Sequence, residues 1–300
     1  MKHTLKITLL LVFVFFVAQV IGLSITNEYI DHKKTTISGD VSFKVLPYNL
    51  ERPQIEESTS YIWIIAAIII GTLLMLLLIK FKKMSIWKLW FFLAVFFTLA
   101  IAFSAFINQT LAAILAFILA LMKIYKPTII TSNLTEIFIY GGLAAIFVPV
   151  INIFAAFMLL ILISVYDIIA VNHTKHMVKL AKFQAKSNLF AGLFIPYGKS
   201  EGKVAKKEKG IIEKKETGKI AVLGGGDIGF PLIFAGVVMK NLMLTNPELI
   251  GFLKTLIIPL FVSLALLYLL VKSRKDKFYP AMPYLTAGCF IGYFVVFLIS

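Results

Sequence analysis

Nine long apolar stretches constrain this chain more than any other feature of its sequence. A helix needs about 20 apolar residues to cross the roughly 30 Å hydrocarbon core of a bilayer. The stretches run roughly over 5–23, 61–79, 87–107, 111–125, 129–148, 152–171, 220–242, 249–271 and 281–299. With 60% hydrophobic residues and a mean hydropathy of +0.92, the composition excludes an ordinary soluble domain. We therefore predict an all-α polytopic membrane protein with nine transmembrane helices.

The basic residues set the predicted orientation. When the nine segments are threaded with the N-terminus inside, the inner regions hold 24 of the 30 Lys and Arg residues. This is the excess that the positive-inside rule describes, so the net charge of +15 indicates orientation and not nucleic-acid binding. We expect the N-terminus inside, the C-terminus outside, and a multi-pass location, in the plasma membrane if the source is prokaryotic. An alternative for the first segment is a cleaved signal peptide, although no clear A-x-A site follows it.

One long charged loop divides the predicted chain into parts. Residues 172–219 mix Lys and Glu, as in "KVAKKEKGIIEKKETGK", a composition typical of a flexible, solvated linker. We expect a six-helix part over 1–171, a flexible basic inside loop over 172–219, and a three-helix part over 220–300. No repeat of fixed period is visible.

Three acids fall within the predicted spans: Glu136, Asp167 and Asp227. A charge inside a bilayer costs a few kcal/mol or more, so each acid requires an explanation. At 1.5 Å per residue, Asp167 lies roughly 6 Å and Asp227 roughly 10 Å from the inner ends of their segments. Two carboxylates at one depth share a proton and supply an acid and a base, as in aspartic proteases. The structural alternative is a hydrogen-bonded pair that locks two helices.

Three glycines precede Asp227 in the stretch "LGGGDIGFP". Glycines weaken a helix and allow another backbone to approach closely. The preceding run 220–223 is β-prone and could pair edge-to-edge with an extended peptide, presenting its scissile bond to Asp227. Close packing of helices is the alternative use of such a glycine run.

Prolines mark the start of the last segment, in Pro280-Ala281-Met282-Pro283. They keep the chain non-helical at the predicted depth of the aspartates, or they are an ordinary proline-marked helix start.

These motifs together resemble those of a known family. Tyr166-Asp167, Gly224-Gly225-Gly226-Asp227 and Pro280-Ala281-Met282 look like the YD, GxGD and PAL motifs of the presenilin and signal peptide peptidase family. They stand in that order on the sixth, seventh and ninth segments, and the compact chain looks most like an archaeal presenilin homologue. The resemblance implies an intramembrane aspartyl protease that cuts transmembrane helices, with Asp167 and Asp227 catalytic.

The same resemblance implies further site residues and partners. Supporting or substrate-binding roles fall to Tyr166, Leu223, Gly224, Gly225, Gly226, Pro280, Ala281 and Met282. Met282 replaces the family's Leu, a nearly isosteric change that predicts altered packing with activity retained. Transmembrane substrate proteins or peptides and the lipid bilayer are the expected partners, without nucleic acid, metal or other cofactor, and a homo-oligomer is left open.

The loop between the sixth and seventh segments is cut autocatalytically in presenilin. Here it contains an apolar island, "LFAGLFIPYG" over 189–198. The island either plugs the site, is trimmed, or lies on the membrane surface, and its flanking lysines favour the last reading.

Other functions and sites remain as alternatives. A proton- or cation-coupled transporter or ion leak pathway would use the same carboxylates, although transporters place broken helices near the midplane. A prepilin peptidase also uses a GxGD aspartate, but without the PAL-like feature. His173 and His176 lack a third metal ligand. Glu136 and Asn133 are interpreted as polar residues at a helix end, outside the site.

Overall fold

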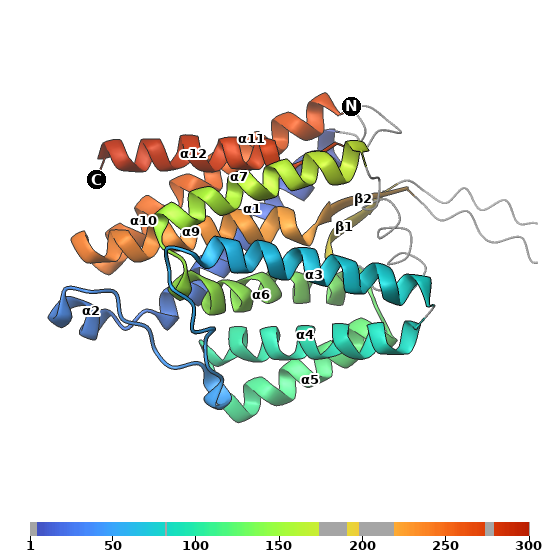
Figure 1. Cartoon of the computed structure of the whole chain (residues 1–300), viewed down its shortest axis with the longest axis horizontal. Helices are drawn as coiled ribbons and strands as arrows, with labels where there is room; N and C mark the ends of the chain where they lie inside the picture. The colour runs from blue at the N-terminus through green and yellow to red at the C-terminus, as the bar shows by residue number, and fades with distance from the viewer. Residues whose placement is uncertain (1–4, 82, 174–190, 198–218, 274–278, 300) are drawn as a thin grey trace, which may run out of the picture.

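The structure is a bundle of helices that run roughly along one direction (Figure 1). This computed structural model describes residues 5–81, 83–173, 191–197, 219–273 and 279–299. Its helices are α1 (Leu5–Tyr29), α2 (His32–Ser38), α3 (Ser60–Lys80), α4 (Met84–Ser104), α5 (Gln109–Tyr125), α6 (Ile129–Phe147), α7 (Ile153–Ile168), α9 (Gly225–Thr245), α10 (Glu248–Thr255), α11 (Ile257–Lys272) and α12 (Met282–Ile299).

Eight spans among the described residues are long and apolar enough to cross a membrane. They include α10 and α11 together, as one span over Glu248–Lys272. The remaining predicted segment is α5, which is apolar but has only 17 residues. The prediction of a helical, multi-span membrane protein is therefore confirmed, and the starts and ends of the helices differ from the predicted segments by a few residues in most cases.

The seventh predicted segment does not begin as a helix, and the run 220–223, which the sequence indicates to be β-prone, is part of a strand. Strand β2 (Lys219–Gly224) precedes α9 and pairs antiparallel with β1 (Gly192–Tyr197). The register places Leu193 opposite Leu223 and Phe194 opposite Val222. This hairpin lies at the end of the bundle where α9 begins (Figure 1). Hydropathy alone cannot separate a short buried strand from the first turns of a buried helix.

The pairing also corrects the favoured reading of the apolar island. Residues 192–197 of the island form β1, and Leu193 is fully buried, so this part does not lie on the membrane surface. Residues 189, 190 and 198 lie outside the described residues, as does most of the 172–219 loop.

Helix α6 occupies a central place because two adjacent glycines let it contact two neighbours. A Cβ added at Gly142 would overlap the backbone carbonyl of Thr98 in α4. A Cβ at Gly141 would lie 3.1 Å from the Cα of Gly22 in α1. Small residues of this kind bring helix backbones together in membrane proteins, where packing and not water exclusion drives association.

The three helices that carry the sequence motifs are joined by an aromatic cluster. Phe157 of α7 packs on Phe234 of α9 at 5.2 Å between ring centroids and on Phe290 of α12 at 4.8 Å. Closer to the motifs, the buried hydroxyls of Ser164 in α7 and Thr286 in α12 lie 2.8 Å apart. These contacts fix the relative height of α7, α9 and α12, and hence of their ends.

Candidate active site

The two predicted catalytic aspartates come together from separate helices. Asp167 is the second-last residue of α7, and Asp227 is the third residue of α9. Asp167 is only 5% exposed, whereas Asp227 is partly exposed. Their carboxylates are close enough to interact electrostatically. Helix α7 passes directly into a π-helical turn over Ile169–His173, a backbone irregularity that is frequent at functional sites.

The PAL-like motif holds Asp167 through its backbone. The Met282 amide donates a hydrogen bond to Oδ2 of Asp167 at 3.1 Å. Met282 begins α12, where amide groups have no partner within the helix and the helix dipole favours a negative charge. Pro280 and Ala281 are partly exposed beside this contact. The motif therefore orients one of the two carboxylates.

The second aspartate is oriented by the first turn of its own helix. Gly224 ends β2 and is the N-cap of α9, and the Asp227 carboxylate lies close to it. An acid at the third helical position reaches back toward the N-cap in the same way in a capping box. A Cβ at Gly224 would lie 3.3 Å from Oδ2 of Asp227, which is tighter than ordinary contact. Gly226 is exposed, so the backbone beside Asp227 is uncovered.

Tyr166 and Leu223, two further residues predicted to belong to the site, are adjacent in sequence to Asp167 and to the glycine run. The Tyr166 hydroxyl lies 3.1 Å from the Thr72 hydroxyl and links α7 to α3. Leu223 is buried in the hairpin, directly before the glycine run. Of the two histidines considered as metal ligands, His173 ends the π-helical turn, and His176 lies outside the described residues.

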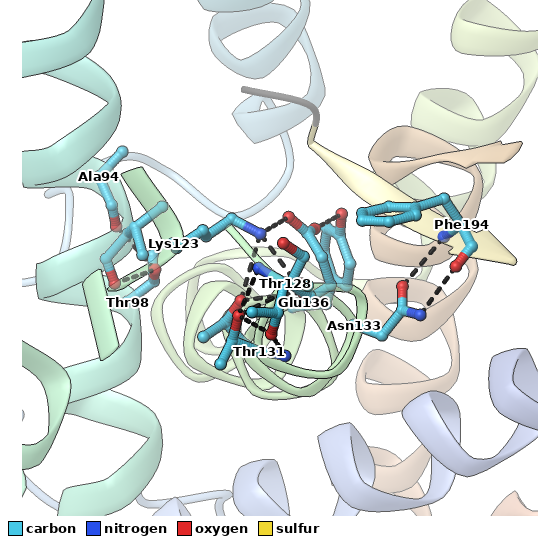
Figure 2. A network of polar contacts seen from close by, with 12 residues as sticks. Ala94, Thr98, Lys123, Thr128, Thr131, Asn133, Glu136 and Phe194 are labelled. Atoms are coloured by element: carbon cyan, nitrogen blue, oxygen red, sulfur yellow. Dashed lines mark hydrogen bonds and ion pairs between the residues drawn. The ribbon is translucent and has the colours of Figure 1, made fainter. Parts of the chain in front are cut away.

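Asn133 and Glu136 are not the solvated polar residues at a helix end that the sequence suggested, because both have partners inside the fold. The Asn133 side chain makes two hydrogen bonds with the backbone of Phe194, one to its carbonyl at 2.8 Å and one from its amide at 3.0 Å. Glu136 is only 1% exposed and forms an ion pair with Lys123 of α5 at 2.6 Å. Figure 2 shows these contacts on two sides of α6, with Lys123 on one and Phe194 on the other.

One signal in the sequence could have revealed this pair. Lys123 and Glu136 both fall in apolar segments joined by a short turn, and a buried charge needs a partner of opposite sign. Lys123 is one of the 24 basic residues assigned to the inner regions, and its side chain is buried in the fold.

The fold and the site together define a class of protein. Aspartates from two helices of a membrane-spanning bundle interact, and one is held by the start of a third helix. This is the arrangement of a polytopic membrane protein with a pair of intramembrane carboxylates.

Comparison with known proteins identifies the family. The family model described as "Signal-peptide peptidase, presenilin aspartyl protease" matches residues 42–300. The chain therefore belongs to the signal-peptide peptidase and presenilin family, and it is an integral, multi-pass membrane protein and an intramembrane aspartyl protease. This membership favours proteolysis over the transporter alternative.

Solved structures support the fold. The chain resembles a structure of "a presenilin family intramembrane aspartate protease in C222 space group" with a TM-score of 0.61 and 17% identity, covering 98% of this chain and 99% of that one. A second structure of such a protease, in the P2 space group, gives a TM-score of 0.59 and 17% identity, covering 97% of both chains. No curated protein sequence matches the chain.

Proposed function

We propose that Asp167 and Asp227 are the catalytic pair and that they hydrolyse peptide bonds within or near the transmembrane helices of other proteins. The observation that carries the proposal is their convergence from α7 and α9, with the Asp167 carboxylate held by the Met282 backbone amide. A backbone amide carries no net charge, so it holds Asp167 without neutralising the interaction between the two carboxylates.

The chemistry follows from two carboxylates that share one proton. The ionised aspartate takes a proton from water as the water oxygen attacks the substrate carbonyl carbon, and the protonated aspartate gives its proton to the carbonyl oxygen. When the diol collapses and the C–N bond breaks, the leaving nitrogen takes the proton of the aspartic acid that had deprotonated the water. The other aspartate, now ionised, takes a proton from a diol hydroxyl, so that an acid and an amine leave and the pair again holds one proton. The two roles belong to the pair and are not divided between Asp167 and Asp227.

A helical substrate must unwind before its amide can be attacked, and β2 offers a place for the extended chain. Within the described residues, the sheet has two strands, so one edge of β2 is paired with β1 and the other is not paired in the sheet. Val222 on β2 is 49% exposed, and the strand leads directly into Gly224 and Asp227. A substrate strand added at this edge would place its next amide beside the aspartates.

The basic residues support an N-inside, C-outside orientation with α5 as a ninth, short span. The part over 1–171 then supplies Tyr166 and Asp167, the basic loop 172–219 and the site face the inside, and 220–300 supplies Asp227 and the PAL-like motif. The last residues of α12 and the first residues of α1 lie at opposite ends of the bundle, as an odd number of membrane crossings requires (Figure 1). Labelling of cysteines placed at Lys33 and Lys126 by an impermeant maleimide, in oriented vesicles, tests this orientation.

Cleavage of a single-span reporter by the purified protein in liposomes tests the catalytic assignment. We expect the wild type to cut within the reporter's span, with product ends identified by mass spectrometry, and both Asp167→Asn and Asp227→Asn to abolish the cut. Asp40→Asn is the matched control, because Asp40 is exposed outside the predicted spans. Persistent cleavage in both aspartate variants would refute the assignment, and a proton or cation flux assay would then test the alternative.

A further inference from the structure

A buried polar chain connects α5 to α6 and ends on the helix that carries Asp227. The Lys123 ammonium binds Oε1 of Glu136 at 2.6 Å and also contacts the Thr135 hydroxyl at 3.2 Å. The Tyr140 hydroxyl, one turn along α6, donates to Oε2 of Glu136. Lys123, Glu136 and Tyr140 are 2%, 1% and 4% exposed. Figure 2 shows the Lys123 side chain reaching Glu136 on α6.

Tyr140 packs on a glycine face at the start of α9. A Cβ added at Gly225 would collide with the Tyr140 hydroxyl and lie 3.1 Å from the ring carbons Cε1 and Cζ. A Cβ at Gly229, one turn later, would lie 3.5 Å from Cδ1 of the same ring. The Tyr140 ring therefore lies along the face formed by these two glycines. Asp227 stands between them in sequence, and its carboxylate interacts electrostatically with Tyr140.

The start of α9 needs such a support. Its N-cap is a glycine whose side chain cannot cap the helix, and its first two helical residues are glycines, which resist helix formation most among non-proline residues. A one-ångström displacement of a catalytic group can cost about 10²-fold in rate. A rigid ring on the glycine face, with its hydroxyl tied to a buried ion pair, opposes that displacement.

We propose that Tyr140 is a positioning residue for Asp227, and that the Glu136–Lys123 ion pair fixes the Tyr140 hydroxyl against Gly225. Position 225 then requires glycine, because the Tyr140 hydroxyl occupies the space that a side chain at this position would need. This inference rests on the proposed function of Asp227.

The test compares two buried tyrosines in the reporter cleavage assay. Tyr140→Phe removes the hydroxyl that is tied to Glu136. Tyr29→Phe is the matched control, because the buried Tyr29 hydroxyl also bonds across helices, to the Ile101 carbonyl at 2.7 Å, in a contact that involves none of the proposed site residues. We expect Tyr140→Phe to lower kcat by roughly ten- to hundredfold with KM near the wild-type value. The control should keep the wild-type kcat.

A double-mutant cycle tests whether the need for glycine at position 225 depends on the Tyr140 hydroxyl. Gly225→Ala should abolish most activity in the wild type but cost less in the Tyr140→Phe background, because the closest contact of the new methyl group has been removed. An equal loss in both backgrounds, or equal kcat values for Tyr140→Phe and Tyr29→Phe, would overturn the positioning role.

The Asp227→Asn variant distinguishes a failure of the proposed function from a failure of the positioning role of Tyr140. Cleavage that survives Asp227→Asn refutes the proposed function and, with it, the inference. Cleavage that requires Asp227 but is indifferent to Tyr140→Phe refutes the inference alone. Absence of cleavage by the wild type would count against both.

Discussion

Removing one member of the Lys123–Glu136 pair should destabilise the fold far more than removing a surface charge. The two side chains are 2% and 1% exposed, and their charged atoms are 2.6 Å apart. Lys123→Met leaves the Glu136 carboxylate buried without its counter-ion, which typically costs about 3–5 kcal/mol of unfolding free energy. Glu136→Gln leaves the Lys123 ammonium in the same position, and a loss of about the same size is expected.

The double variant Lys123→Met/Glu136→Gln should recover most of this loss. It removes both charges, and the Gln amide oxygen can still accept the hydrogen bond from Tyr140. The double variant is therefore expected within about 1–2 kcal/mol of the wild type, which requires a coupling of several kcal/mol between the two sites. If the loss of unfolding free energy in the double variant equals the sum of the two single losses, the two charges do not stabilise each other as proposed.

Reversible unfolding in mixed micelles of a mild detergent and dodecyl sulfate, followed by circular dichroism, measures these differences. Lys44→Met is the control, since Lys44 and Glu28 are 3.9 Å apart and about half exposed, and such pairs contribute about 0–1 kcal/mol. If Lys123→Met is no more destabilising than Lys44→Met, the pair does not have the buried, desolvated character that its geometry indicates.

Three further changes have expected outcomes. Asn133→Ala removes both hydrogen bonds to Phe194, so we expect a loss of about 1–3 kcal/mol and faster hydrogen exchange of the amides of β1, measured by mass spectrometry. Met282→Leu should retain cleavage and change stability by less than about 1.5 kcal/mol, because the backbone amide and not the side chain binds Asp167; loss of activity in the reporter assay would contradict this. Gly142→Ala should cost about 1–3 kcal/mol or prevent folding, because its methyl group meets the Thr98 carbonyl, whereas Gly71→Ala in α3 meets nothing within 4 Å and should stabilise by up to about 1 kcal/mol in the same unfolding assay.

Hydropathy was sufficient to predict most of the helices because each one had to bury about 20 apolar residues in lipid. It placed Asp167 near the end of α7 and predicted that Asp227 would lie at a similar depth, and the two carboxylates interact electrostatically. Hydropathy alone did not separate strand β2 from α9, because the strand is as apolar as a helix. The β-prone residues 220–223 indicated an extended run before Gly224, but the pairing with β1 was not predicted.

The polar residues of α6 were misread for a related reason. Depth along one helix suggested that Asn133 and Glu136 lie near the membrane surface, where water would satisfy them. Their partners are Phe194, 61 residues away, and Lys123, 13 residues away, and only the folded bundle brings these together. A one-dimensional depth scale contains no information about such contacts.

The β1–β2 pairing has a consequence for the continuity of the chain. Six cross-strand residue pairs join 192–197 to 219–224, and Asn133 ties β1 to α6. A break in the peptide chain anywhere between 197 and 219 would therefore leave both new ends attached to the same folded body. The sequence could be divided there into two genes whose products assemble without a covalent link, and the covalent connection would matter for synthesis more than for the finished architecture.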